Sequence, residues 1–384
     1  MNRREFVALA AMVPGVSALS QVSGGREPVQ AAQQPPFTFY SPLAEAWYRG
    51  GEYFTWTSTT ENNARRTVEV FYRSFGRRNN PAIVILHGFR SSSFDFRELI
   101  ALLEHDYFLC ALDFPGFGFS DKPQDGYSYM LKDDARLLDY YVREVVGLAS
   151  FHLLTHDRGV STGLAFLGDY LDAPRRDYEI TYHFLSNSGS FLPLANRPEG
   201  ANRILHPVQG AEVIEEVRSR PRVIEGDPLA VARADVHAFN DGLGAELYLV
   251  RYQLERAAHE DRWLANLTAS PVPTALFWGV LDTSNPVRIA NHIWMEHMNA
   301  REPESSFWLL PTAGHYPQLD APQAVYEIVR TCLTGRIPSP EDENAFMSDL
   351  AAERTNPASP VYVGRSHIRE LSFPGAVQYS PAGY

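Results

Sequence analysis

One nine-residue stretch constrains the fold of this chain most: Phe151-His152-Leu153-Leu154-Thr155-His156-Asp157-Arg158-Gly159. An apolar run ends in a polar residue and a glycine, and small and apolar residues at helical spacing then continue to Phe166. This order predicts a strand, a sharp turn and a helix, in which the strained turn exposes one side chain above a sheet. The usual sequence of such a turn is Gly-x-Ser-x-Gly. Here Thr155 stands at the first glycine and Asp157 at the serine.

An aspartate at the exposed position of the turn predicts covalent catalysis. Its carboxylate can attack carbon directly and form an alkyl or acyl ester, which water must then cleave. The alternative is structural, because aspartate is also a favoured N-cap of a helix. The choice between the two depends on whether the rest of the chain supplies groups that activate water.

Strands and helices alternate along the chain, which predicts an α/β fold with a doubly wound, mostly parallel sheet. Alternating polarity at Glu52–Ser58 and Arg66–Ser74 predicts an antiparallel hairpin. The unbroken apolar run Ala82–Leu86 is typical of a parallel strand buried on both faces. Further strands are expected at Phe108–Leu112, directly before Asp157, and at Ile180–Leu185, Thr274–Trp278 and Ser306–Leu310. Helices are expected at 94–102, Lys132–Leu148, directly after Asp157, Pro286–Met298 and Gln323–Leu333.

The alternation lapses between Ser186 and about Ser270, where only helical pieces remain, at Val213–Arg218, Leu229–Phe239 and Ala245–Leu267. With 384 residues, 45% of them hydrophobic, we expect one large domain with an insertion. Residues 37–185 and 271–334 then form the core, and residues 186–270 form an inserted helical cap. The tail at residues 335–384 is rich in Pro, Ser and Glu, and is expected to wrap the surface or to be partly disordered.

Charge and cysteine content limit the partners. The net charge is −12 and no basic run is interleaved with aromatic residues, so nucleic acid is a poor candidate, and we expect a small-molecule substrate. Cys110 and Cys332 are interpreted as buried apolar residues rather than a disulfide or a metal site. No CxxC or HExxH motif occurs, so neither a metal nor another cofactor is expected.

Residues 1–36 are interpreted as a signal or a disordered N-terminus. Asn2-Arg3-Arg4-Glu5-Phe6 opens an uncharged stretch that continues to Gly25 and has small residues at Val16-Ser17-Ala18. The paired arginines indicate twin-arginine export, and therefore the periplasm. The apolar part is too short and too broken by Gly and Pro for a membrane span, so none is expected in the mature chain. If the segment is an ordinary terminus, the protein is cytoplasmic.

Three polar residues, Asp157, Asp282 and His315, each follow directly after a predicted strand. Because ligands in parallel α/β sheets bind beyond the carboxyl ends of the strands, these residues can converge on one site. Asp157 would attack an electrophilic carbon, and His315, oriented by Asp282, would take a proton from water. The alternatives are a turn residue at Asp282 and a surface-loop histidine at His315.

The segment His87-Gly88-Phe89 follows another predicted strand. The backbone N–H groups of Phe89 and Arg158 are expected to form an oxyanion hole for the ester carbonyl. The alternative for His87-Gly88 is a simple strand-to-loop turn.

These motifs together resemble the α/β-hydrolase superfamily, in the branch of epoxide hydrolases and haloalkane dehalogenases, and most closely hydrolases like the mesoderm-specific transcript protein. The resemblance covers about Phe54 to Leu333 and implies the α/β-hydrolase fold. The similar stretches are Leu86-His87-Gly88-Phe89, Ala111–Pro123, Thr155-His156-Asp157, Leu185–Gly189, Gly279-Val280-Leu281-Asp282 with Asn285-Pro286, His315-Tyr316-Pro317-Gln318-Leu319 and the segment from Arg251-Tyr252 through Arg262-Trp263.

The resemblance to each substrate class is incomplete. Epoxide hydrolases usually carry Pro where this chain has Arg90, and two cap tyrosines, for which the candidates are Tyr252 and, less well placed, Tyr248. Haloalkane dehalogenases hold the halide with Trp after the nucleophile, where this chain has Arg158. Fluoroacetate dehalogenases use two arginines, of which this chain has Arg158 but Ser161 in place of the second.

The sequence therefore favours a cofactor-free, epoxide hydrolase-like enzyme with Asp157 as nucleophile. Tyr252, Tyr248 and His87 are expected to contact the substrate, and the alternative for Tyr252 is a core aromatic residue on the cap helix. Two alternatives stay open: a haloalkane or haloacid dehalogenase-like hydrolase, and a non-catalytic homologue that binds a ligand without turnover.

Overall fold

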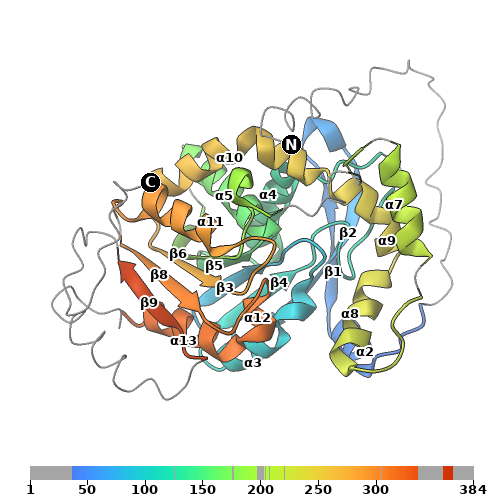
Figure 1. The fold of residues 1–384 in the computed structure, drawn as a ribbon, viewed down its shortest axis with the longest axis horizontal. Helices are drawn as coiled ribbons and strands as arrows, with labels where there is room; N and C mark the ends of the chain where they lie inside the picture. The colour runs from blue at the N-terminus through green and yellow to red at the C-terminus, as the bar shows by residue number, and fades with distance from the viewer. Residues whose placement is uncertain are drawn as a thin grey trace.

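A computed structural model of the chain describes residues 37–335, apart from 125, 175–176, 197–202, 204, 207, 220 and 303, together with residues 358–365. The expected export signal at residues 1–36 lies outside the described residues. The described part is built around one twisted sheet with helices on both faces (Figure 1).

The sheet has nine strands in the order β1-β2-β4-β3-β5-β6-β7-β8-β9. Their bounds are β1 Glu52–Thr57, β2 Thr67–Phe75, β3 Ala82–Leu86, β4 Phe108–Leu112, β5 Ser150–His156, β6 Glu179–Ser186, β7 Thr274–Gly279, β8 Ser305–Leu310 and β9 Val361–Arg365. Strands β4, β3, β5, β6, β7 and β8 pair in parallel, and β1, β2 and β9 are antiparallel to their neighbours. The predicted mostly parallel sheet and its N-terminal hairpin are confirmed.

Both faces of the parallel strands are buried, which explains their unbroken apolar sequences. In β3, Val84 and Leu86 belong to one apolar cluster, and Ile83 and Ile85 belong to the other. Helices α4 (Leu131–Tyr140), α5 (Arg158–Asp172), α10 (Tyr252–Ala269) and α11 (Val287–Ile293) cover the first face (Figure 1). Helices α3 (Arg97–Leu103), α12 (Pro317–Asp320) and α13 (Pro322–Leu333) cover the second (Figure 1). The α4 and α11 helices each continue into a π-helical turn, η3 (Tyr141–Val145) and η5 (Trp294–Met298).

The segment between β6 and β7 contains α7 (Gln209–Arg218), α8 (Pro228–Ala238), α9 (Gly242–Leu249) and α10. One helix was expected over Ala245–Leu267, but α9 ends at Leu249 and α10 starts at Tyr252. Helix α10 packs on α5 and α4, and the Glu255 carboxylate accepts hydrogen bonds from the backbone N–H of Leu131 (2.6 Å) and Lys132 (3.2 Å). The end of the inserted segment therefore belongs to the helix layer of the core.

Strand β9 was not predicted, because its five residues lie in the Pro- and Ser-rich tail. It pairs antiparallel with β8 and closes that edge of the sheet. Tyr362 is buried, and its ring lies 4.8 Å from that of Trp308.

The contact between α5 and the end of β3 generates a stability prediction. A Cβ atom on Gly159 would lie 2.6 Å from the carbonyl oxygen of Leu86 and 2.7 Å from that of His87. Because both neighbours are backbone atoms, we expect Gly159→Ala to lower the free energy of unfolding by about 1–3 kcal/mol. Urea denaturation measures the loss, with Gly364→Ala as control, since a Cβ there meets nothing within 4 Å. Equal effects of the two substitutions would contradict the assigned contact.

Candidate active site

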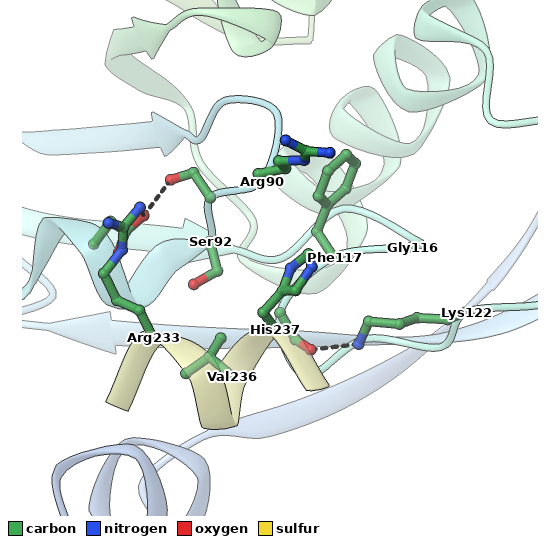
Figure 2. Close-up of a pocket in the computed structure, with 11 residues that line it drawn as sticks. Arg90, Ser92, Gly116, Phe117, Lys122, Arg233, Val236 and His237 are labelled. Atoms are coloured by element: carbon green, nitrogen blue, oxygen red, sulfur yellow. Dashed lines mark hydrogen bonds and ion pairs between the residues drawn. The ribbon is translucent and has the colours of Figure 1, made fainter. Parts of the chain in front are cut away.

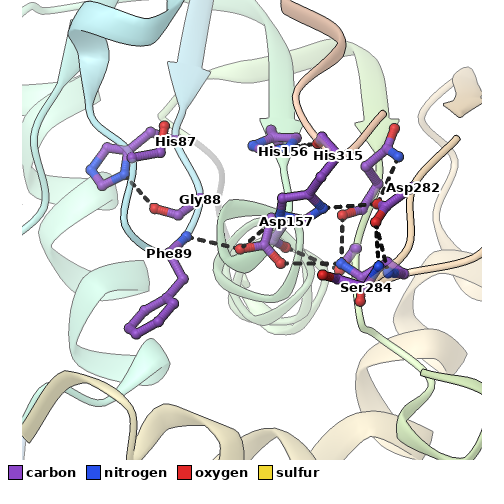
Figure 3. Close-up of polar contacts among 12 residues, drawn as sticks. His87, Gly88, Phe89, His156, Asp157, Asp282, Ser284 and His315 are labelled. Atoms are coloured by element: carbon purple, nitrogen blue, oxygen red, sulfur yellow. Dashed lines mark hydrogen bonds and ion pairs between the residues drawn. The ribbon is translucent and has the colours of Figure 1, made fainter. Parts of the chain in front are cut away.

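Asp157 occupies the sharp turn between β5 and α5, with φ 48° and ψ −113°. This region of backbone space costs a non-glycine residue about 1–3 kcal/mol and recurs at functional sites. The Asp157 side chain makes no capping hydrogen bond to α5. The structure therefore does not support the N-cap alternative, and the carboxylate is turned towards the ends of the neighbouring strands (Figure 3).

The Asp157 carboxylate is buried but has partners on both oxygens. Its Oδ2 accepts a hydrogen bond from the Phe89 N–H (2.8 Å) and lies 4.0 Å from His315 Nε2. Its Oδ1 lies 3.5 Å from Asn285 Nδ2. Burial raises the pKa of Asp157, but the charges of His315 and Arg256 outweigh burial and hold that pKa below its ordinary value. The carboxylate is therefore ionised at neutral pH, as a nucleophile requires.

Asp282 orients His315. The His315 Nδ1 lies 2.8 Å from Asp282 Oδ2, and because an ionised carboxylate only accepts, Nδ1 carries the proton. The Asp282 carboxylate also accepts from the N–H groups of Ser284 (2.8 Å) and Asn285 (2.9 Å) and from Asn187 Nδ2 (2.9 Å). Burial lowers the pKa of His315, but the hydrogen bond to Asp282 and the charge of Asp157 outweigh it, so the pKa is raised. The structure thus brings all three sequence-predicted residues together (Figure 3).

Two further residues hold this arrangement, and the sequence did not reveal their roles. His156 Nε2 donates to the carbonyl oxygen of His315 (2.6 Å), and burial lowers the pKa of His156 to about 4, so that its ring is neutral. Asn187, with φ 43°, donates to the carbonyl oxygen of Gly314 (3.2 Å) as well as to Asp282. Both lie in motifs that the resemblance included, but their contacts are with loops more than 90 residues away.

His87 differs from its expected role in substrate binding. Its Nδ1 lies 2.8 Å from the carbonyl oxygen of Gly88, and its Nε2 accepts from the N–H of Phe114 (3.0 Å). The ring is fully buried, which lowers the pKa of His87 to about 3, and it is turned away from Asp157 (Figure 3). With both nitrogens bonded, His87 stabilises the loop that presents the Phe89 N–H to Asp157.

Arg158 contributes its backbone, whose N–H lies in the first turn of α5, where helical N–H groups have no intrahelical partner. Its side chain is fully buried, forms an ion pair with Asp134, and lies 5.1 Å from the ring of Phe117 and 5.3 Å from that of Tyr252. The Arg158 charge is therefore already paired inside the protein.

The two tyrosines expected to contact substrate lie on different helices. Tyr252 in α10 is buried, and its ring lies 5.6 Å from that of Phe89. Tyr248 in α9 is half-buried, and its ring lies 5.7 Å from the guanidinium of Arg251. Of the two, Tyr252 packs beside the residue whose N–H contacts Asp157.

Arg256 was not predicted, because only the packing of α10 on α5 brings it to the site. Its side chain is buried, its Nε donates to Ser161 Oγ (2.9 Å), and its guanidinium lies 4.8 Å from the Tyr252 ring. Its charge contributes to the lowered pKa of Asp157.

Arg90, where the resemblance leads one to expect Pro, ties the loop after β3 to α9. Its guanidinium donates to both carboxylate oxygens of Glu246 at 2.9 and 2.6 Å, and His237 Nε2 lies 3.0 Å from the same carboxylate. Beside these groups is a small polar cavity of about 20 Å³, lined also by Lys122 and Arg233 (Figure 2). This volume suits about one water molecule.

Within the described residues, no group of three or more His, Cys, Asp or Glu side chains could hold a metal ion. Cys110 and Cys332 are both buried and free. In the same part of the chain, no helix has the length and apolarity that a membrane span requires.

The hydrogen bond between His315 and Asp282 generates a prediction for the pKa of the His315 ring. By nuclear magnetic resonance, the His315 ring should titrate above 6.5, and Asp282→Asn should lower its pKa because the partner charge is lost. A pKa raised by folding contributes stability that is complete below the unfolded pKa and is lost as pH rises through the folded pKa. The variant should therefore lose more stability at pH 6 than at pH 9. An unchanged His315 titration would show that Asp282 does not control this ring.

The comparisons with known proteins identify the family of the fold. A family model described as "Alpha/beta hydrolase family" matches residues 83–328. The protein of Mycobacterium tuberculosis named "Putative hydrolase LipZ" is 31% identical over 76% of this chain and 99% of its own length. The mesoderm-specific transcript protein of Mus musculus is 29% identical over 73% of this chain and 85% of its own.

Among solved structures, the haloalkane dehalogenase DbeA from Bradyrhizobium elkani superposes with a TM-score of 0.58 and 22% identity, over 74% of this chain and 98% of its own. At this identity the likeness shows the fold alone. The strand order, the turn at Asp157 and the match of the family model lead to one conclusion: this chain is a hydrolase of the α/β-hydrolase family.

Proposed function

We propose that this hydrolase uses Asp157 as its nucleophile and is epoxide hydrolase-like. The observation that carries the proposal is the geometry of the Asp157 carboxylate, which stands in a strained turn 4.0 Å from the Nε2 atom of a histidine that Asp282 orients. A pure binding protein has no need of all three groups.

In the first step, Asp157 Oδ1 attacks an epoxide carbon while Oδ2 stays bonded to the Phe89 N–H. A carbon–oxygen bond of the epoxide breaks, and its oxygen leaves as an alkoxide that takes up a proton. Tyr252, which packs against Phe89, is the better-placed of the two tyrosines to give that proton. The product of this step is an ester on Asp157.

In the second step, His315 Nε2 takes a proton from water, and the resulting hydroxide attacks the carbonyl carbon of the ester. The Phe89 and Arg158 N–H groups bind the oxygen that becomes negative. When the ester bond breaks, the leaving diol oxygen takes the proton from His315, and the acid formed at Asp157 gives its proton through solvent to the Tyr252 oxygen. The diol departs, and the Asp157 carboxylate is restored. The Asp157 carboxylate can also attack the carbon of an alkyl halide and displace the halide ion. The test below therefore includes alkyl halides.

We also propose that residues 1–36 export the protein by the twin-arginine route, so that it meets small molecules in the periplasm. The support is the sequence Asn2-Arg3-Arg4-Glu5-Phe6 and the uncharged stretch after it. Replacing Arg3 and Arg4 by Lys in a bacterial host should keep the protein in the cytoplasm when fractions are compared by immunoblot. Unchanged fractionation of the double variant would contradict this route.

Removal of the base should trap the ester. We expect His315→Gln, incubated with styrene oxide, glycidate, 1-bromobutane and 2-chloropropionate, to gain mass on the peptide that contains Asp157, because water activation is lost. An epoxide adds its whole mass, and an alkyl halide adds its mass less that of the hydrogen halide, so mass spectrometry identifies the reaction. With any substrate that turns over, the rate should fall by about 10²–10⁴-fold.

Two variants serve as controls for the trap. Asp157→Ala combined with His315→Gln should gain no mass, and His105→Gln, at a histidine whose side chain is 92% exposed, should not accumulate ester. An adduct on another residue would contradict the assignment of the nucleophile. No adduct with any of the four compounds would favour a non-catalytic, ligand-binding protein.

A further inference from the structure

Within the part of the chain that the structure describes, Arg256 is a buried cation without a carboxylate partner. The residue is 3% exposed, and among the described residues it takes part in no ion pair within 4.0 Å. Its Nε is bonded to the neutral hydroxyl of Ser161, but its Nη2 is buried without a hydrogen-bond partner in the described part of the chain. An unsatisfied charged donor in a protein interior is costly, so its retention requires an explanation.

The neighbouring charged residues each have another partner. Arg158 is paired with Asp134, and the Glu260 carboxylate, one turn along α10, accepts from the Leu192 N–H at 2.9 Å. The anion whose pKa Arg256 lowers is Asp157. When Asp157 becomes a neutral ester, this compensation is lost while the Arg256 charge remains.

One side of the Arg256 guanidinium faces the loop after β6. A Cβ atom on Gly189 would lie 2.7 Å from Arg256 Nη1 and 3.1 Å from Asn285 Oδ1. Glycine at this position therefore allows the guanidinium to lie against backbone, next to the Asn285 side chain whose Nδ2 is 3.5 Å from Asp157 Oδ1. The ring of Tyr252, which is in the same helix α10, lies 4.8 Å from the Arg256 guanidinium and packs over it.

We propose that Arg256, held by Ser161, binds a carboxylate on the substrate, so that the enzyme acts on small acids with an electrophilic carbon beside the carboxylate. The planar guanidinium fork matches a carboxylate in shape and charge. A neutral substrate leaves Nη2 unpaired, whereas a carboxylate satisfies it and remains charged after Asp157 is esterified. The proposal rests on the proposed function, and it narrows the substrates to compounds such as 2,3-epoxy acids or 2-halo acids.

The first test compares matched electrophiles that differ only in charge. In the His315→Gln background, we measure the ratio of the glycidate labelling rate at Asp157 to the glycidamide labelling rate. This ratio should fall at least about tenfold when Arg256 is also replaced by Gln. Arg262→Gln is the matched control, since Arg262 lies on the same helix with a side chain that is 72% exposed. It should leave the ratio unchanged.

The second test measures binding without turnover. In calorimetry, propionate should bind the wild-type protein and propionamide should not. Arg256→Gln should weaken propionate binding at least about tenfold. Ser161→Ala, which removes the hydrogen-bond partner of Arg256 Nε, should weaken propionate binding less. This variant takes the place of Arg256→Gln in the test if Arg256→Gln does not fold. The comparison of the two probes on the wild-type protein needs no variant.

The outcomes separate this inference from the proposed function. Equal labelling ratios with and without Arg256 would overturn the carboxylate site and leave the Asp157 nucleophile intact. Propionate binding that depends on Arg256, with no adduct from any electrophile, would support the carboxylate site and contradict the proposed catalysis. If no adduct forms and propionate does not bind, the inference is overturned.

Discussion

The strained backbone at Asp157 is the constraint on which the rest of the site depends. Only a turn of this kind lifts the carboxylate out of α5 and towards the ends of β3, β6 and β7. Gly159 and Gly88 permit the turn to pack closely, since a Cβ on either would meet atoms at 2.6–2.8 Å. The cost of this strain, about 1–3 kcal/mol, is offset by the packing of the surrounding parallel sheet.

Electrostatics then assigns different roles to similar side chains. His87 and His156 are buried with lowered pKa values of about 3 and 4, so they stay neutral and act through fixed hydrogen bonds. His315 is also buried, but the Asp282 hydrogen bond and the Asp157 charge raise its pKa. A neutral ring supports a loop, whereas a ring between two carboxylates can exchange a proton near neutral pH. The burial of each ring and its carboxylate partners therefore decide which histidine is suited to be the base.

The sequence predicts those features that depend on local pattern. Buried parallel strands appear in the sequence as unbroken apolar runs. Asp157 follows β5 directly, and Asp282 and His315 lie in the loops just after β7 and β8, so both the sheet and this set of residues were foreseeable. Strand β9, the break between α9 and α10, and the position of Arg256 depend on packing between distant segments, which local pattern does not encode. His87 was misjudged because its position next to Gly88 is visible in the sequence, whereas its bond to the Phe114 N–H is not.

The central claim is that water attacks the carbonyl carbon of an ester on Asp157 and not the substrate itself. A single turnover in water labelled with ¹⁸O, using an electrophile that labels the protein, distinguishes these routes directly. We expect the first turnover to place ¹⁸O in the Asp157 carboxylate, and the product to receive an unlabelled oxygen from the protein. Label found in the product, with none in the peptide that contains Asp157, would contradict it.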